Sequence, residues 1–192
     1  MSEQVMDVSD VGQLVSEISA LRARVAQLQE RVEQLDLLAH EDSLVDLPNR
    51  RGFVRALERL IDRVSRYQEK AALLFVDLDG LKLINDSFGH QAGDAALIQV
   101  ARLLVGGVRK SDVVARIGGD EFAILLGHSD EESARETAAR LVDVIADSDF
   151  THDDQVLPLS VAIGAALIEA DDSPESAMAR ADHEMYRRKA AA

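Results

Sequence analysis

The chain has 192 residues, 47% of them hydrophobic and 29% charged, and its formal net charge is −14 at pH 7. This length suits one domain of ordinary size with an accessory segment. The acidic excess argues against binding to nucleic acid or to an anionic membrane, because both need basic surface. The absence of cysteine excludes disulfides and thiolate chemistry and is consistent with the cytoplasm, where we expect the protein. We find neither a signal peptide nor the ~18 apolar residues of a membrane span.

Apolar residues recur at alternating steps of three and four near the N-terminus. β-branched residues at a with leucine at d favour a parallel two-stranded coiled coil, whereas a helix packed on its own domain would show a wider stripe. We therefore predict that residues 1–40 form a dimerising helix and that residues 41–192 form the main domain. The a positions are Val11, Ile18, Val25, Val32 and Ala39, and the d positions are Leu14, Leu21, Leu28 and Leu35.

The helical pattern is broken between His40 and Arg51. Pro48 disfavours helical geometry at the residue before it. Asn49 can then cap a new helix, which we predict from about Arg50 to Tyr67.

A short apolar run, residues 71–76, predicts a strand that is buried on both faces. Asp77 and Asp79 follow it directly. A carboxylate at the end of a buried strand is partly desolvated, so a cation is its natural partner. The alternative for Asp79 is that it caps the following helix.

Two further apolar runs, residues 113–117 and 122–126, flank a glycine pair and predict a β-hairpin. Glycine permits positive φ and leaves the tip without side-chain bulk, so a phosphate can approach the main chain. Acidic groups beside it would repel a phosphate unless a divalent cation lies between them. The alternative is a solvated hairpin tip. The turn consists of Gly118, Gly119, Asp120 and Glu121.

The sequence from Gly118 to Phe122 is the signature of the GGDEF family of diguanylate cyclases, and the chain resembles this family from about Asp42 to Lys189. Members condense two GTP into cyclic di-GMP and release pyrophosphate. The resemblance implies an α+β fold of the nucleotide-cyclase-like (ferredoxin-like) type with βααββαβ order. The predicted elements indicate an antiparallel hairpin with helices on one face of the sheet.

The resemblance also implies how a metal and the phosphates are bound. The carboxylates of Asp77 and Asp120 and the main-chain carbonyl of Leu78 would bind Mg²⁺ or Mn²⁺, and Glu121 would support the metal or catalysis. Lys82 would contact a phosphate during catalysis. The remaining phosphate-side contacts implied for the substrate come from Gly118, Gly119 and Lys189.

The resemblance implies that Asn85 and Asp94 bind the guanine base. His90, in the same segment, is a further substrate-binding residue that the resemblance implies. A carboxylate accepts the N1–H and N2–H₂ donors of guanine, whereas adenine presents an acceptor at N1, and this mismatch discriminates between the two. The alternative is that Asn85 and Asp94 are helix caps. We expect Asp94 to open a helix from Ala95 to about Val108.

Arg109 and Asp112 form an Arg-x-x-Asp pattern that five residues separate from the glycine pair, where the family has its product-inhibition site. The planar guanidinium suits both a phosphate and the O6/N7 edge of guanine. The alternative is an arginine that stabilises a helix end. One departure from the family is Val45-Asp46 in the turn before Pro48, where members usually carry a Thr-Gly pair and glycine supplies positive φ.

The rest of the chain predicts a helix from Asp130 to Asp147, a strand from Val156 to Ile168 with Pro158 near its start, and a final helix from Ser173. As an enzyme, the protein would be a Mg²⁺-dependent homodimer that binds GTP and is inhibited by its product. The alternatives are a non-catalytic cyclic di-GMP receptor and a dimeric scaffold.

Overall fold

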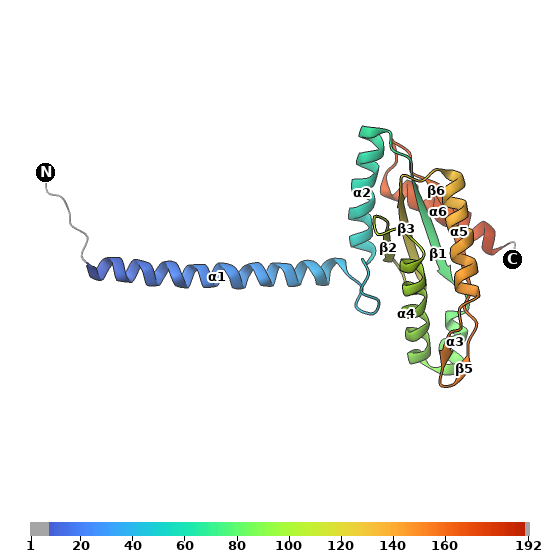
Figure 1. Ribbon diagram of the computed structural model, residues 1–192, viewed down its shortest axis with the longest axis horizontal. Helices are drawn as coiled ribbons and strands as arrows, with labels where there is room; N and C mark the ends of the chain where they lie inside the picture. The colour runs from blue at the N-terminus through green and yellow to red at the C-terminus, as the bar shows by residue number, and fades with distance from the viewer. Residues whose placement is uncertain (1–7, 191–192) are drawn as a thin grey trace. The chain divides into compact units, whose positions relative to one another are not determined.

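The computed structural model describes residues 8–190, without the side chains of residues 8–15, 33, 37 and 38, so the predicted core positions Val11 and Leu14 lie outside the described side chains. The chain divides into two units between Ala39 and His40. The first unit contains the long helix α1, Val8–His40 (Figure 1). The apolar stripe of this helix is exposed to solvent, and a single helix cannot bury its own stripe. Six predicted core positions are 48–64% exposed: Ile18, Leu21, Val25, Leu28, Val32 and Leu35.

The second unit is built on a four-stranded antiparallel sheet with the strand order β2-β3-β1-β6. The predicted hairpin of β2 and β3 is present, and the α+β fold is confirmed. The order of elements is a helix, then βααββαβ with a small extra hairpin before the last long strand, and then a final helix. The four strands are β1 (Ala71–Leu78), β2 (Val113–Arg116), β3 (Glu121–Gly127) and β6 (Val161–Leu167).

Helices cover both faces of this sheet, so the expectation that they lie on one face is wrong. In β1, Leu74 and Val76 pack against one layer of helices, whereas Leu73 and Phe75 pack against the other. A strand that is apolar at every position needs cover on both sides. The first layer contains α3 (Leu81–Phe88), α4 (His90–Gly106) and α5 (Glu131–Ala146), and the second contains α2 (Arg50–Tyr67) and α6 (Pro174–Lys189).

Asn49 caps α2 as predicted, because its side chain accepts hydrogen bonds from the amides of Arg51 and Gly52. The predicted strand from Val156 to Ile168 is wrong in its first half. The short strand β5 (Gln155–Val156) pairs with β4 (Thr151–His152), and β6 begins only at Val161. Pro158 lies between β5 and β6, where it cannot donate to a ladder.

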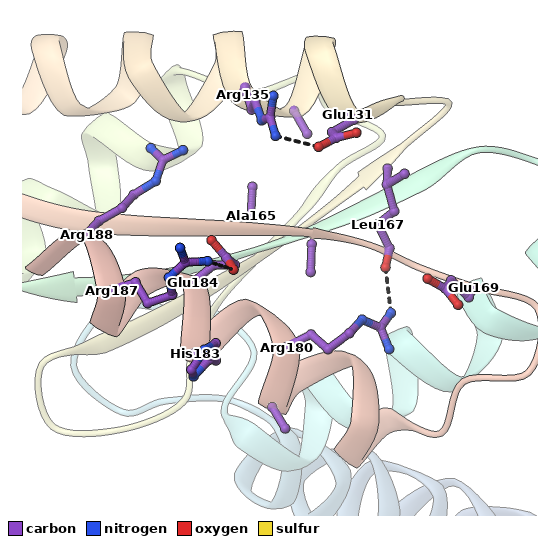
Figure 2. A pocket seen from close by; sticks show the side chains of 13 residues that line it. Glu131, Arg135, Ala165, Leu167, Glu169, Arg180, His183, Glu184, Arg187 and Arg188 are labelled. Atoms are coloured by element: carbon purple, nitrogen blue, oxygen red, sulfur yellow. Dashed lines mark hydrogen bonds and ion pairs between the residues drawn. The ribbon is translucent and has the colours of Figure 1, made fainter.

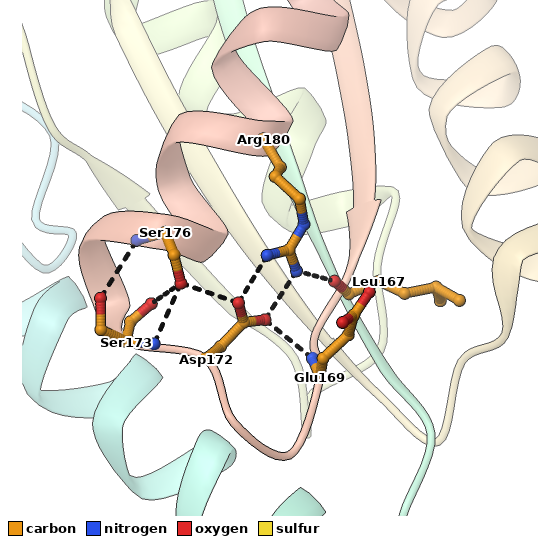
Figure 3. Close-up of polar contacts among 6 residues, drawn as sticks. All are labelled: Leu167, Glu169, Asp172, Ser173, Ser176 and Arg180. Carbon is orange, nitrogen blue, oxygen red and sulfur yellow. Dashed lines mark hydrogen bonds and ion pairs between the residues drawn. The ribbon is translucent and has the colours of Figure 1, made fainter.

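The last helix is held at its N-terminus by polar contacts (Figure 3). Ser173 and Ser176 form a reciprocal capping box. Arg180 donates to both carboxylate oxygens of Asp172 at 2.5 and 2.6 Å and to the Leu167 carbonyl at 2.7 Å. This arginine lowers the pKa of Asp172 to about 2. The contacts fix α6 against the end of β6. No helix within residues 8–190 is long and apolar enough to cross a membrane.

Candidate active site

The carboxylates of the first strand and of the hairpin lie side by side, as the sequence predicts. Asp77 is paired with Glu121 across the β1–β3 ladder, and directly opposite residues project to the same face of a sheet. The Leu78 amide donates to the Asp120 carbonyl at 2.9 Å. The end of β1 therefore meets the start of β3 with three acidic side chains.

The charges in this cluster are compensated unevenly. The Lys189 ammonium donates to Asp77 and lies 3.4 Å from Asp79 Oδ1, and the bond to Asp77 raises the pKa of Lys189. Partial burial raises the pKa of Glu121, and the nearby Asp120 and Asp77 raise it further. One end of the cluster thus carries a cation, whereas Glu121 is partly buried among other carboxylates.

The donor set suits a hard divalent cation. Asp77, Asp120 and the Leu78 carbonyl supply oxygen ligands, which Mg²⁺ prefers. Within residues 8–190, no group of three or more His, Cys, Asp or Glu side chains is arranged to hold a metal alone. Mg²⁺ is commonly bound by one or two carboxylates together with substrate phosphates. The residues therefore fit an ion that binds with a nucleotide rather than one held in a complete protein cage.

Neither hairpin glycine is required by its backbone geometry, and only Gly118 lies where a side chain would meet a neighbour. The expectation of positive φ is wrong for both, because among the described glycines only Gly80 and Gly89 adopt it. A Cβ on Gly118 would lie 2.2 Å from Glu121 Oε2, whereas a Cβ on Gly119 would meet no atom within 4 Å. Gly118 thus makes room for the Glu121 carboxylate, and Gly119 leaves the tip open to a ligand.

The predicted guanine-binding residues lie together where α3 meets α4. A Cβ on Gly93 would lie 2.0 Å from Asn85 Oδ1, so the Asn85 amide packs against the helix at the residue before Asp94. Gly93 was not predicted as part of the site, although a buried glycine inside a helix is a signal of close packing. The expectation that Asp94 opens its helix is wrong, because α4 begins at His90 after Gly89, whose φ is 85°.

Two other predicted residues lie at the starts of helices. Lys82 lies in the first turn of α3 and His90 in the first turn of α4, and both are exposed. Among the contacts of the described residues, none joins either side chain to Asp77 or Asp120. Their assigned contacts with phosphate and substrate therefore stay predictions.

Arg116 anchors the hairpin tip, a role that the sequence did not indicate. Its guanidinium donates to the Gly119 carbonyl at 2.7 and 3.3 Å and to the Asp42 carboxylate at 3.2 and 3.3 Å. Its amide donates to the Pro48 carbonyl at 3.0 Å. One side chain thus joins the turn that precedes α2 to the tip that carries Asp120.

The turn before Pro48 carries Val45-Asp46 where members of the family usually have a Thr-Gly pair. Asp46 adopts φ = 50°, and Asp is among the non-glycine residues that tolerate this region. The Asp42 side chain accepts the amides of Leu44 and Val45 at 2.9 and 3.2 Å, and the Asp42 amide donates to the Leu47 carbonyl at 2.7 Å. Asp46 thus supplies the positive φ that a glycine would.

A separate cavity of about 290 Å³ contains the predicted inhibitory residues Arg109 and Asp112. The Asp112 carboxylate accepts the Arg109 amide at 2.9 Å and the Gly127 amide at 3.3 Å. Arg140, on α5, lines the same cavity. The sequence did not single out Arg140, because only the packing of α5 brings it next to this loop.

Comparisons with known proteins agree with this geometry. The family described as diguanylate cyclase, GGDEF domain, matches residues 39–192. The chain is 40% identical over 158 residues to the probable diguanylate cyclase DgcE of Escherichia coli (strain K12). It is 41% identical over 153 residues to the diguanylate cyclase TpbB of Pseudomonas aeruginosa (strain UCBPP-PA14). These alignments cover 81% and 77% of this chain but only 14% and 34% of the two relatives, which are much longer.

Solved structures extend the similarity to the N-terminal helix. The coiled coil and GGDEF domain of DgcB from Caulobacter crescentus, solved in complex with c-di-GMP, superposes with a TM-score of 0.86. The identity is 26%, and the match covers 93% of this chain and 95% of that one. The GGDEF domain of Pseudomonas aeruginosa (PAO1) TpbB is 38% identical with a TM-score of 0.75, covering 80% and 90% of the two chains. The chain therefore belongs to the GGDEF family of diguanylate cyclase domains.

Proposed function

We propose that the protein is a diguanylate cyclase that condenses two GTP into cyclic di-GMP in the cytoplasm, where GTP is made. The observation that supports this most directly is the convergence of Asp77, Asp120 and Glu121 at a glycine tip that is open to a ligand. In this reaction each 3′-hydroxyl attacks the α-phosphate of the other GTP. Two phosphodiester bonds form and two pyrophosphates leave.

The acidic cluster is the site of nucleotidyl transfer. Asp77, Asp120 and the Leu78 carbonyl would hold Mg²⁺ or Mn²⁺, which when bound neutralises the triphosphate and favours ionisation of the attacking hydroxyl. Lys189, already at the cluster, lies where it can contact a phosphate, and Lys82 adds a second cation from α3. Glu121, paired with Asp77 across the ladder, would support the metal or catalysis from beside these ligands.

Asn85 and Asp94 bind the guanine edge. Their positions at the α3–α4 junction are set by the close approach of Asn85 to Gly93. A carboxylate at Asp94 accepts hydrogen bonds from guanine and leaves adenine with an unmatched acceptor, which favours GTP over ATP. His90, in the first turn of α4, contributes a further polar group on the same helix end.

The reaction needs two copies of the domain, because the hydroxyl that attacks each GTP belongs to the GTP bound by the other copy. We infer that α1 brings the copies together as a parallel coiled coil through its exposed apolar stripe. Tethering raises the effective concentration of one site at the other, so the encounter behaves as an intramolecular step.

Product binding at a second site is part of this proposal. Arg109 and Asp112 line a polar cavity with Arg140, and two arginines with a carboxylate suit the phosphates and guanines of cyclic di-GMP. The same cavity supports the alternative function, a receptor that binds cyclic di-GMP without catalysis. The intact acidic cluster favours the cyclase.

One substitution separates these functions. In Asp120→Asn, a ligand carboxylate becomes an amide of the same size, and we expect production of cyclic di-GMP from GTP and Mg²⁺ to fall by at least ~100-fold with an unchanged melting temperature. Asp62→Asn, on the exposed side of α2, is the matched control and should keep wild-type turnover. Chromatography of the nucleotides after incubation measures both. Wild-type protein that binds cyclic di-GMP but makes none would establish the receptor instead.

A further inference from the structure

β6 is an edge strand whose outer hydrogen-bonding side faces a cavity. The bonds from the Asp79 amide to the Ser160 carbonyl and from the Ile168 amide to the Ala71 carbonyl, both 2.9 Å, fix the phase of the β1–β6 ladder. In this register the even-numbered residues of β6 bond to β1, and the odd-numbered residues direct their N–H and C=O groups outward. Ala165 and Leu167 therefore present backbone groups that have no partner among the described residues, except for the Leu167 carbonyl, which accepts from Arg180.

The cavity beside this edge has a volume of about 720 Å³, within the range of ligand-binding sites. Its floor is formed by residues 165–167, and its walls are formed by α5 and α6. Figure 2 shows Ala165 between arginines that belong to the two helices. Because α5 covers one face of the sheet and α6 the other, the gap between them continues the plane of the sheet.

The walls carry a positive excess within a strongly acidic chain. Four arginines and three glutamates line the cavity, whereas the whole chain has a net charge of −14. Arg135 and Arg187 are paired with Glu131 and Glu184 on their own helices, and these exposed ion pairs are weak enough to exchange partners. Arg188 has no ion pair among the described residues.

We propose that the outer edge of β6 is a docking site for an extended acidic peptide from a partner protein, which adds to the sheet as a strand between α5 and α6. Main-chain hydrogen bonds to Ala165 and Leu167 supply the pairing. Side chains alternate along a strand, so successive peptide residues point toward α5 and toward α6. Acidic residues at these positions meet Arg135 on one side and Arg187 or Arg188 on the other. This proposal goes beyond the proposed cyclase activity and does not depend on it.

A second copy of the chain is disfavoured as the occupant. Pairing of two β6 edges would bring the same arginines of both copies together, and like charges across an interface oppose association. An unprotected edge strand is also a hazard for aggregation, and a groove lined by charged side chains limits which strands can enter.

The test uses the full-length protein without GTP, so its outcome is independent of cyclase activity. The probe is a fluorescein-labelled octapeptide of alternating valine and glutamate, and the control peptide has lysine at every glutamate. We expect fluorescence anisotropy to show binding of the glutamate peptide and at least tenfold weaker binding of the lysine peptide. Hydrogen–deuterium exchange should slow within residues 161–168 when the glutamate peptide is bound.

Two pairs of variants locate the site. Ala165→Pro removes an outward N–H while leaving the β1 ladder intact, and should weaken binding about tenfold, whereas Ala165→Ser should bind as the wild type does. Arg188→Glu should weaken binding at least threefold. Arg59→Glu, on the exposed face of α2, should leave binding unchanged. If Ala165→Pro fails to fold, Arg188→Glu and the exchange data decide. Equal binding of both peptides would overturn the proposal, and so would protection from hydrogen exchange only outside residues 161–168. Self-association of the protein that Ala165→Pro abolishes would overturn it as well, because the occupant would then be a second copy.

Discussion

Replacing Arg116 by alanine should lower the stability of the domain moderately and its turnover severely. The Arg116 side chain is only 14% exposed and binds both the Asp42 carboxylate and the Gly119 carbonyl. A hydrogen bond to a charged group contributes ~1.5–3 kcal/mol, and the exposed carbonyl regains water when the arginine is lost. We therefore expect the free energy of unfolding to fall by about 2 kcal/mol.

The effect on turnover should be much larger than this loss of stability implies. Without the guanidinium, no other contact among the described residues holds the Gly119 carbonyl, so the residue before Asp120 loses its anchor and the bond from the Leu78 amide to the Asp120 carbonyl must hold Asp120 alone. A displacement of about 1 Å at a catalytic group costs on the order of 100-fold in rate, which is the loss we expect in kcat. Arg116→Lys should fall between, because one ammonium replaces a fork that serves two acceptors.

Arg180 provides the matched control, because it too binds an aspartate and a backbone carbonyl, at Asp172 and Leu167. Arg180→Ala should lose a similar free energy of unfolding but keep its turnover. Urea unfolding and a coupled pyrophosphate assay at a temperature where both variants are folded measure the two quantities. If Arg116→Ala keeps wild-type turnover, or if both variants lose it equally, the anchoring role of Arg116 is refuted.

Three other predictions follow from single contacts. Gly93→Ala should displace Asn85, raise the KM for GTP about tenfold and reduce discrimination against ATP in competition assays, although alanine favours the helix by ~1 kcal/mol. The pKa of Asp172 is lowered from 3.8 to about 2, so its stabilising effect is complete above pH 4 and is lost as the pH falls through 2. The difference in unfolding free energy between wild type and Asp172→Asn should therefore shrink from about 2 kcal/mol at pH 7 toward zero at pH 2 in urea titrations. Leu28→Glu should give monomers in sedimentation and at least tenfold lower turnover at micromolar protein, recovering as the concentration rises.

The sequence was sufficient to predict features that depend on near neighbours. Asn49 after Pro48 located the start of α2, and a glycine pair between two apolar runs located the β2–β3 hairpin. The neighbouring positions of Asp77 and Asp120 could also be expected, because each lies at the end of a buried strand.

Contacts between distant residues could not be read in the same way. The pairing of Arg116 with Asp42 joins positions 74 residues apart. The sequence around each residue does not distinguish it from a charged side chain on the surface. The approach of Gly93 to Asn85 depends on how α3 packs on α4. The split of the last predicted strand had a local sign in Pro158, but the short hairpin before β6 lacked enough apolar residues to mark it.

The bond between Lys189 and Asp77 links the final turn of the last helix to the first strand, 112 residues earlier. Two residues this far apart in the sequence can meet only after the chain between them has folded, because closing a long loop costs conformational entropy. The acidic end of β1 is therefore neutralised only when α6 has docked on the sheet. Local unfolding of the last turn of α6 would leave Asp77 and Asp79 without this cation while the sheet itself stays paired.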